Sequence, residues 1–208
     1  KCKGLVKGGR QKNKLALHQI GNYVHIQWQA RLEEQLGLFT LESEKNYSAI
    51  AMQNKESLLF LNVTCAMINA CLSEKQNVEG LLGASLVLLE MMEHPRLWEE
   101  LYLKWEISLL AELGFALDLT SCAATGQTGD LIYVSPKSGR AVSRDAGEPY
   151  KNKLFKLPYF LLVDEVKPRK ADLLDGFTIT THFLEQCIFK PARKIIPDVR
   201  SRLIDRLK

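Results

Sequence analysis

The cations near the start of this sequence are the residues best suited to chemistry with a partner. Residues 1–14 contain six lysines and arginines and no carboxylate. Four of them lie in and just after a Gly-Gly turn: Lys7, Arg10, Lys12 and Lys14. Such side chains can line a groove that holds phosphates, and nearby aromatic rings can stack on bases. The set therefore predicts contacts to single-stranded nucleic acid, with Tyr23 as the stacking residue. A solubilising end of the chain is the alternative.

A second chemical pattern lies around Cys122. Residues 119–146 have the spacing of a CxxC…CxxC zinc ribbon, but Thr125, Ser143 and Ala146 stand at the other three ligand positions. A structural zinc site needs four good ligands. We therefore expect no zinc and no other cofactor, and we expect this segment to be held by apolar packing of Leu131, Tyr133, Val134 and Val142.

No catalytic arrangement is recognisable. The sequence contains no GxSxG motif and no Gly-rich loop that ends in Lys-Ser/Thr. The four histidines share no HxH or HxxxH spacing. An enzyme that uses Cys122 as nucleophile is a weak alternative, because no histidine lies in the same segment. We expect no catalytic residue and no enzyme activity.

The composition is that of a globular protein with two basic ends. The chain has 208 residues and a net charge of +4, and residues 190–208 carry seven cations against two carboxylates. Such ends suit a polyanionic partner. No apolar run approaches the roughly 18 residues of a membrane span. The five scattered cysteines do not suggest a disulfide framework, so we expect a reducing cytoplasm.

Residues 1–46 have the pattern of a small β unit. Polar and apolar residues alternate over 22–33 and again over 38–44, which predicts a hairpin. Trp28 shares an apolar face with Val24 and Ile26, so we expect it in the core, although Trp28 and Phe39 are also possible stacking residues. Because the alternation is already under way at Lys1, we expect that an N-terminal segment has been lost, with a tag or a start-site error as the alternative.

The rest of the chain, 48–208, has mainly helical periodicity. Helices are expected over 48–72, 78–93, 97–113, 170–189 and 198–207, with Gly114 as a C-cap. The first three are apolar on most sides, which predicts a buried bundle. Residues 118–150 interrupt this pattern and predict an irregular insert with a small hairpin.

Three segments together resemble the bacterial RecO family of recombination mediators. They are the Gly4–Arg10 strand and turn, the Glu112-Leu-Gly-Phe115 helix end that leads to Cys122-Ala-Ala-Thr-Gly126, and the 133–147 segment. The resemblance implies an α+β fold. A partial oligonucleotide-binding (OB) β-barrel at 1–46 would precede a mostly helical domain at 48–208 with a zinc-ribbon-like, metal-free insert at 118–150.

The resemblance also implies a non-catalytic function in DNA repair and recombination. Such proteins bind single- and double-stranded DNA, promote annealing, and act with RecR to load RecA on DNA coated by single-strand binding protein. They dock the acidic C-terminal tail of that protein on the helical domain. The exposed sides of helices 98–113 and 170–189 are candidates for this groove, with Arg96, Lys104 or Lys170 as the cation. The implied location is the bacterial cytoplasm, at the nucleoid.

A different class of function is the main alternative. The chain could be a protein-interaction adaptor in which only the helical domain acts. A mediator should bind single-stranded DNA with an affinity that falls steeply with salt, whereas an adaptor should bind little at any salt concentration.

Overall fold

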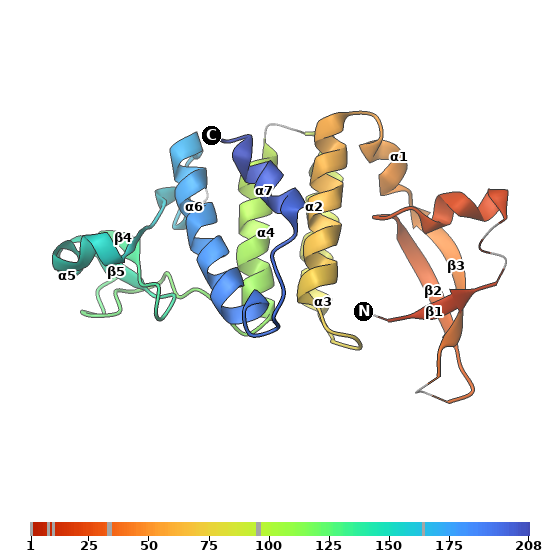
Figure 1. The fold of residues 1–208 in the computed structure, drawn as a ribbon. Helices are drawn as coiled ribbons and strands as arrows, with labels where there is room; N and C mark the ends of the chain where they lie inside the picture. The colour runs from red at the N-terminus through yellow and green to blue at the C-terminus, as the bar shows by residue number, and fades with distance from the viewer. Residues whose placement is uncertain (1, 8, 10, 33–34, 95–96, 164) are drawn as a thin grey trace.

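The computed structural model has two small sheets separated by a layer of helices (Figure 1). It describes all residues except 1, 8, 10, 33–34, 95–96 and 164, and it describes only the backbone at 12–14 and 93. The N-terminal sheet lies at one end of the molecule and the smaller sheet at the other. This arrangement confirms the predicted α+β class. Among the described residues, no helix is long and apolar enough to cross a membrane.

The N-terminal sheet has three strands, β1 (Gly4–Val6), β2 (Tyr23–Gln29) and β3 (Gly37–Lys45). Their order is β1-β3-β2. β2 and β3 form the predicted antiparallel hairpin, and β1 pairs with β3 in parallel. The sheet is open, so the described strands do not close a barrel.

The apolar face of this sheet is only partly covered. Cross-strand pairing places Trp28 opposite Phe39 and Ile26 opposite Leu41 on that face. The prediction that Trp28 lies in the core is wrong, because Trp28 is 41% exposed and Ile26 is 44% exposed. The physical reason is that an open sheet of three strands has too little structure packed on this face to bury both side chains.

A short 3-10 helix, η1 (Lys12–His18), also departs from the prediction of an all-β segment. The sequence Lys-Asn-Lys-Leu-Ala-Leu-His contains no β-branched residue, which lowers its tendency to form a strand. η1 contributes Leu17 and His18 to a hollow that the sheet shares. It therefore lies across part of the apolar face.

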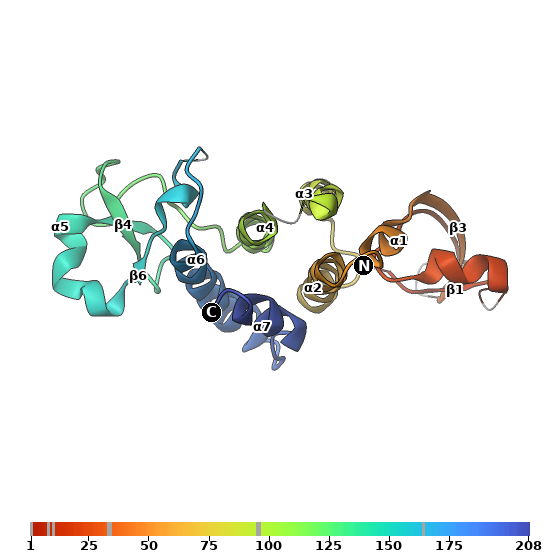
Figure 2. The same ribbon diagram turned by 90° about the horizontal axis from the view of Figure 1, so that it is seen from above.

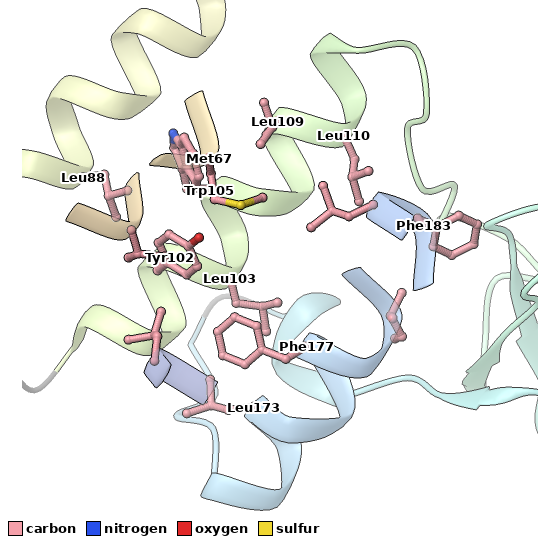
Figure 3. Close-up of a cluster of buried hydrophobic side chains, with 14 of the residues drawn as sticks. Met67, Leu88, Tyr102, Leu103, Trp105, Leu109, Leu110, Leu173, Phe177 and Phe183 are labelled. Atoms are coloured by element: carbon pink, nitrogen blue, oxygen red, sulfur yellow. The ribbon is translucent and has the colours of Figure 1, made fainter. Parts of the chain in front are cut away.

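The helical body follows the sheet. Its helices are α1 (Tyr47–Ala51), α2 (Lys55–Cys71), α3 (Glu79–Glu90), the 3-10 turn η2 (Met91–Glu93), α4 (Trp98–Glu112), α6 (Lys170–Phe183), which continues as the π-helix η6 (Leu184–Phe189), and α7 (Asp198–Asp205). Seen from above, α4 lies between α3 and α6 (Figure 2). Figure 3 shows its side chains Tyr102, Leu103 and Trp105 packed among residues of both neighbours. The predicted bundle is therefore present, although Leu82 and Val87 of α3 face outward.

One predicted helix is broken. The sequence predicts a continuous helix over 48–72, but the structure divides it between Ala51 and Lys55. The Asn54 side chain accepts a hydrogen bond of 2.7 Å from the Ser57 backbone N–H and so caps the start of α2. An asparagine N-cap satisfies an otherwise unpaired N–H group, which favours a new helix start here.

The insert has the predicted hairpin and one strand more. β4 (Leu131–Val134) pairs antiparallel with β5 (Ala141–Ser143) and with β6 (Phe155–Lys156). The short helix α5 (Arg144–Gly147) and the 3-10 turns η4 (Glu148–Lys153) and η5 (Tyr159–Leu161) complete it. Leu131, Val134 and Val142 are buried, and Tyr133 packs against the core. The predicted apolar packing of this segment is thus confirmed.

Candidate nucleic-acid interface

Lys7 lies at a hollow in the N-terminal sheet. It directly follows β1 and is exposed. The Gly9 backbone N–H donates to the Val6 carbonyl at 3.2 Å, which turns the chain away from the strand. The hollow has a volume of about 310 Å³ and is lined by Val6, Lys7, Gln11, Leu17, His18, Phe39, Thr40 and Leu41. A cation at the mouth of a partly apolar hollow can hold a phosphate while a base occupies the hollow.

Phe39 is the aromatic ring that the structure brings to Lys7. A Cβ atom built at Gly4 would lie 2.8 Å from this ring, so the glycine allows β1 to run directly alongside it. Trp28 lies opposite Phe39 on β2. The structure therefore gathers Lys7, Phe39 and Trp28 at one end of the sheet.

Tyr23 lies at the far end of β2. It is 38% exposed and pairs with Lys45 of β3. Since a strand rises about 3.3 Å per residue, Tyr23 is roughly 16 Å along the strand from Trp28. Tyr23 is thus accessible for stacking but does not share the hollow with Lys7. A nucleic acid that contacts both residues must run along the sheet.

The other predicted cations are described less fully. Arg10 lies outside the described residues. The backbone of Lys12 and Lys14 belongs to η1, whose other residues line the hollow, but their side chains are not described. Gln11 and His18 also line the hollow. Sequence reasoning missed both, because the hollow exists only once η1 folds against the sheet.

The Tyr23 end of the sheet is joined to the helical body by polar contacts. Lys45 Nζ lies 4.9 Å from the centre of the Tyr47 ring and 3.2 Å from a carboxylate oxygen of Glu90. The hydrogen bond to Glu90 raises the pKa of Lys45. The Ser48 backbone N–H donates to the Asn22 side chain at 3.0 Å. These contacts link the sheet to α1 and α3 and leave a cation beside Tyr23.

Two of the zinc-ribbon positions, Ser143 and Thr125, lie against the Cys122 thiol. The Cys122 thiol is 1% exposed and accepts hydrogen bonds of 3.3 Å from both the backbone N–H and the hydroxyl of Ser143. Burial alone would raise the thiol pKa, but hydrogen bonds from Ser143 and Thr125 outweigh it and lower the pKa to about 6. Within the described part of the chain, no group of three or more His, Cys, Asp or Glu side chains could hold a metal ion.

The sequence matches known proteins along nearly its whole length. Residues 52–194 match the family model described as the C-terminal part of recombination protein O. The chain is 40% identical to a "DNA repair protein RecO" of Rhodospirillum centenum over 99% of its own length and 82% of the relative. Proteins of the same name from Caulobacter vibrioides and Bartonella tribocorum are 40% and 42% identical over 97% of this chain, covering 83% and 81% of those relatives.

These relatives are bacterial DNA repair proteins. With a family model over more than half of the chain and such identity over nearly all of it, the chain belongs to the RecO family. This confirms the resemblance drawn from the sequence motifs.

Proposed function

We propose that this chain is a DNA repair protein that binds single- and double-stranded DNA through its N-terminal sheet. It acts as a recombination mediator, promoting strand annealing and, with RecR, the loading of RecA on DNA coated by single-strand binding protein. Its place of action is the bacterial cytoplasm, at the nucleoid. The observation that carries the proposal is the accessible hollow where Lys7 meets Phe39, in a chain of the RecO family. Arg10, Lys12, Lys14 and Tyr23 extend this DNA contact.

A non-catalytic function fits the chemistry around the most unusual thiol. The side chains that hydrogen-bond Cys122 are those of Ser143 and Thr125. Nucleophilic catalysis requires that a substrate reach the thiol, and the Cys122 side chain is only 1% exposed. The proposed mediator therefore works by binding and not by bond chemistry.

The finer description of the fold is part of the same proposal. Residues 1–46 represent part of an OB-type barrel, and residues 118–150 form a zinc-ribbon-like insert without metal. The open three-stranded sheet and the Cys122–Ser143 contact support these assignments. Elemental analysis of the purified chain should find no stoichiometric zinc, whereas about one zinc per chain would refute the metal-free insert.

The acidic tail of single-strand binding protein is proposed to dock beside α6. A groove of about 560 Å³ runs between α6, β6 and α7. Its apolar lining includes Leu174, Phe177 and Ile204, and its cation is Lys208, which pairs with Asp205 at 2.8 Å. An acidic tail with an aromatic side chain needs such an apolar groove and a nearby cation. Of the cations considered from the sequence, Lys170 begins α6, Lys104 pairs with Glu100 on α4 at 3.1 Å, and Arg96 lies outside the described residues.

Calorimetry with the tail peptide tests this groove. The parent chain should bind it with micromolar affinity, roughly −8 kcal/mol. Leu174→Glu should abolish the heat of binding, because it places a carboxylate in the apolar lining. Lys104→Ala, on the other candidate helix, should leave it unchanged. If Lys104→Ala loses the heat of binding and Leu174→Glu keeps it, the docking site lies on α4 instead.

A salt series on the parent chain separates a mediator from an adaptor. Binding of labelled single-stranded DNA, followed by fluorescence anisotropy, should weaken steeply and log-linearly as salt rises, because each phosphate contact releases counterions. Binding that is negligible even at low salt would refute the proposed DNA function and favour the adaptor.

A further inference from the structure

One cation from each basic segment of the chain contacts the C-terminal end of α2 or the connection that follows it. Lys3, just before β1, forms an ion pair with Glu74 in the connection between α2 and α3. Lys194, in the loop before α7, donates from Nζ to the Ala70 carbonyl at 3.4 Å. Since Ala70 and Glu74 are four residues apart, the N-terminal sheet and the C-terminal loop approach the same end of α2 (Figure 1).

The loop that carries Lys190, Arg193 and Lys194 has a hydrogen-bonded backbone. The π-helix η6 ends at Phe189, and the Lys194 backbone N–H then donates to the Phe189 carbonyl at 2.9 Å. Arg193 adopts a left-handed backbone conformation with φ 53°. π-helical turns and left-handed non-glycine residues are frequent where a protein holds a functional segment in place.

These cations are not neutralised locally. Lys190, Arg193 and Lys194 are all exposed. Within the described residues, no carboxylate lies within ion-pair distance of Lys190 or Arg193, whereas Arg206, the residue after α7, pairs with Glu56 at 2.6 Å. Three adjacent cations of this kind produce a field that attracts a polyanion.

A groove with an aromatic wall lies beside the loop. It has a volume of about 460 Å³. Residues 70–74, including the Glu74 that pairs with Lys3, line one side, and Cys187, Ile188, Ala192 and Lys194 line the other. Phe115 lines it and is 39% exposed. The end of α4 holds the backbone of this residue, because the Phe115 backbone N–H donates to the Leu110 carbonyl at 2.8 Å and Gly114 turns the chain with φ 89°. This is a Schellman motif, which sets the direction in which the chain leaves the helix.

We propose that this groove is a second nucleic-acid contact that extends the path of a single strand from the N-terminal sheet onto the helical body. Phe115 stacks on a base, and Lys190, Arg193 and Lys194 contact the phosphates. A stacking ring beside a row of cations is the combination that binds single strands without sequence preference. Three cations on one loop suit a polymer with several phosphates better than a single carboxylate. The inference rests on the proposed DNA function.

The test compares short and long oligothymidylates on the full chain. One variant carries Lys190→Gln, Arg193→Gln and Lys194→Gln. Its matched control carries Lys137→Gln, Lys153→Gln and Lys156→Gln, which remove the same charge from exposed positions of the insert. Affinity for a strand of about 30 nucleotides should fall about tenfold in the first variant, with a salt slope lower by roughly 2. Affinity for a strand of about 8 nucleotides should change less than about twofold, because the sheet alone holds it.

Phe115 is tested separately. Phe115→Ala should lower the affinity for the 30-nucleotide oligothymidylate about tenfold without changing the salt slope of binding. Phe115→Trp should keep the affinity of the parent, because stacking needs a ring and not a charge. Circular dichroism establishes that each variant is folded.

The outcomes distinguish the two proposals. A parent chain that binds neither strand overturns the proposed function and this contact with it. A parent that binds both strands, with the loop and Phe115 variants indistinguishable from the control, overturns the second contact alone.

Discussion

At the scale of single residues, Arg200 connects three helices through one buried ion pair. Its guanidinium contacts both carboxylate oxygens of Glu106 on α4, at 2.6 and 2.8 Å, and the hydroxyls of Thr180 and Thr181 on α6. Removal of one partner leaves the other charge buried and unpaired. Arg200→Met should therefore lower the free energy of unfolding by about 3–5 kcal/mol in urea denaturation.

Two further variants check that interpretation. Adding Glu106→Gln to Arg200→Met should recover much of the loss, because no unpaired charge remains. Arg206→Ala, which removes an exposed pair with Glu56, should cost less than about 1 kcal/mol. An equal loss for Arg200→Met and Arg206→Ala would show that burial of the pair does not matter.

Cys122 gives the stability of the protein a predictable dependence on pH. Its pKa of about 6 in the folded chain lies below the ordinary thiol value of about 8.5. Between these two values the unfolded chain holds a proton that the folded chain has released, so stability should rise with pH across this window. Below pH 6 the contribution of Cys122 to the stability is lost.

Urea denaturation at pH 6 and at pH 8.5 tests this. Cys122→Ala should abolish the rise in the free energy of unfolding between these two pH values. Cys71→Ala should keep it, because burial raises the pKa of Cys71 to about 12. An unchanged pH dependence in Cys122→Ala would contradict the assignment.

At the scale of elements, two glycines should respond in opposite ways to the same substitution. Gly114 has a φ of 89°, which L side chains rarely adopt, although a Cβ there would meet nothing within 4 Å. Gly114→Ala should therefore destabilise the protein by about 1 kcal/mol. Gly83 lies inside α3 with equally open space, so Gly83→Ala should stabilise it by roughly 0.5–1 kcal/mol. Thermal unfolding measures both changes, and a stabilised Gly114→Ala variant would refute the role of the C-cap.

Elements with a strong local signal were predictable from the sequence. The hairpin partners 22–33 and 38–44 and the turn at Gly114 depend on alternation or on one conformational requirement, and the structure contains them, with Gly114 one residue after the C-cap Leu113. Features that depend on distant residues were not predictable. The exposure of Trp28 depends on what packs over the sheet, and the Glu106–Arg200 pair joins residues 94 positions apart. The Asn54 cap did leave a signal, a polar break within the apolar pattern, that identifies a helix start in retrospect.

The candidate site was predictable in composition but not in arrangement. The basic turn and the neighbouring aromatic residues are visible in the sequence, and the structure places Lys7 beside one of those rings. That ring is Phe39, whereas Tyr23 lies at the other end of β2. The strand register decides this, and it depends on the pairing of β2 with β3 and not on local composition.

At the scale of the whole molecule, the N-terminal sheet is the proposed main DNA contact, and the helical body is the proposed docking site for proteins. The most direct test changes Arg10, Lys12 and Lys14 together to Ala and measures single-stranded DNA binding across a salt series. The control changes Lys137, Lys153 and Lys156 to Ala. Affinity should fall about equally for all DNA sequences, and the salt slope should fall by roughly 2, since each lost phosphate contact contributes about 0.7. A triple variant that keeps the affinity and slope of the control would show that these cations are a solubilising end and that DNA binds elsewhere.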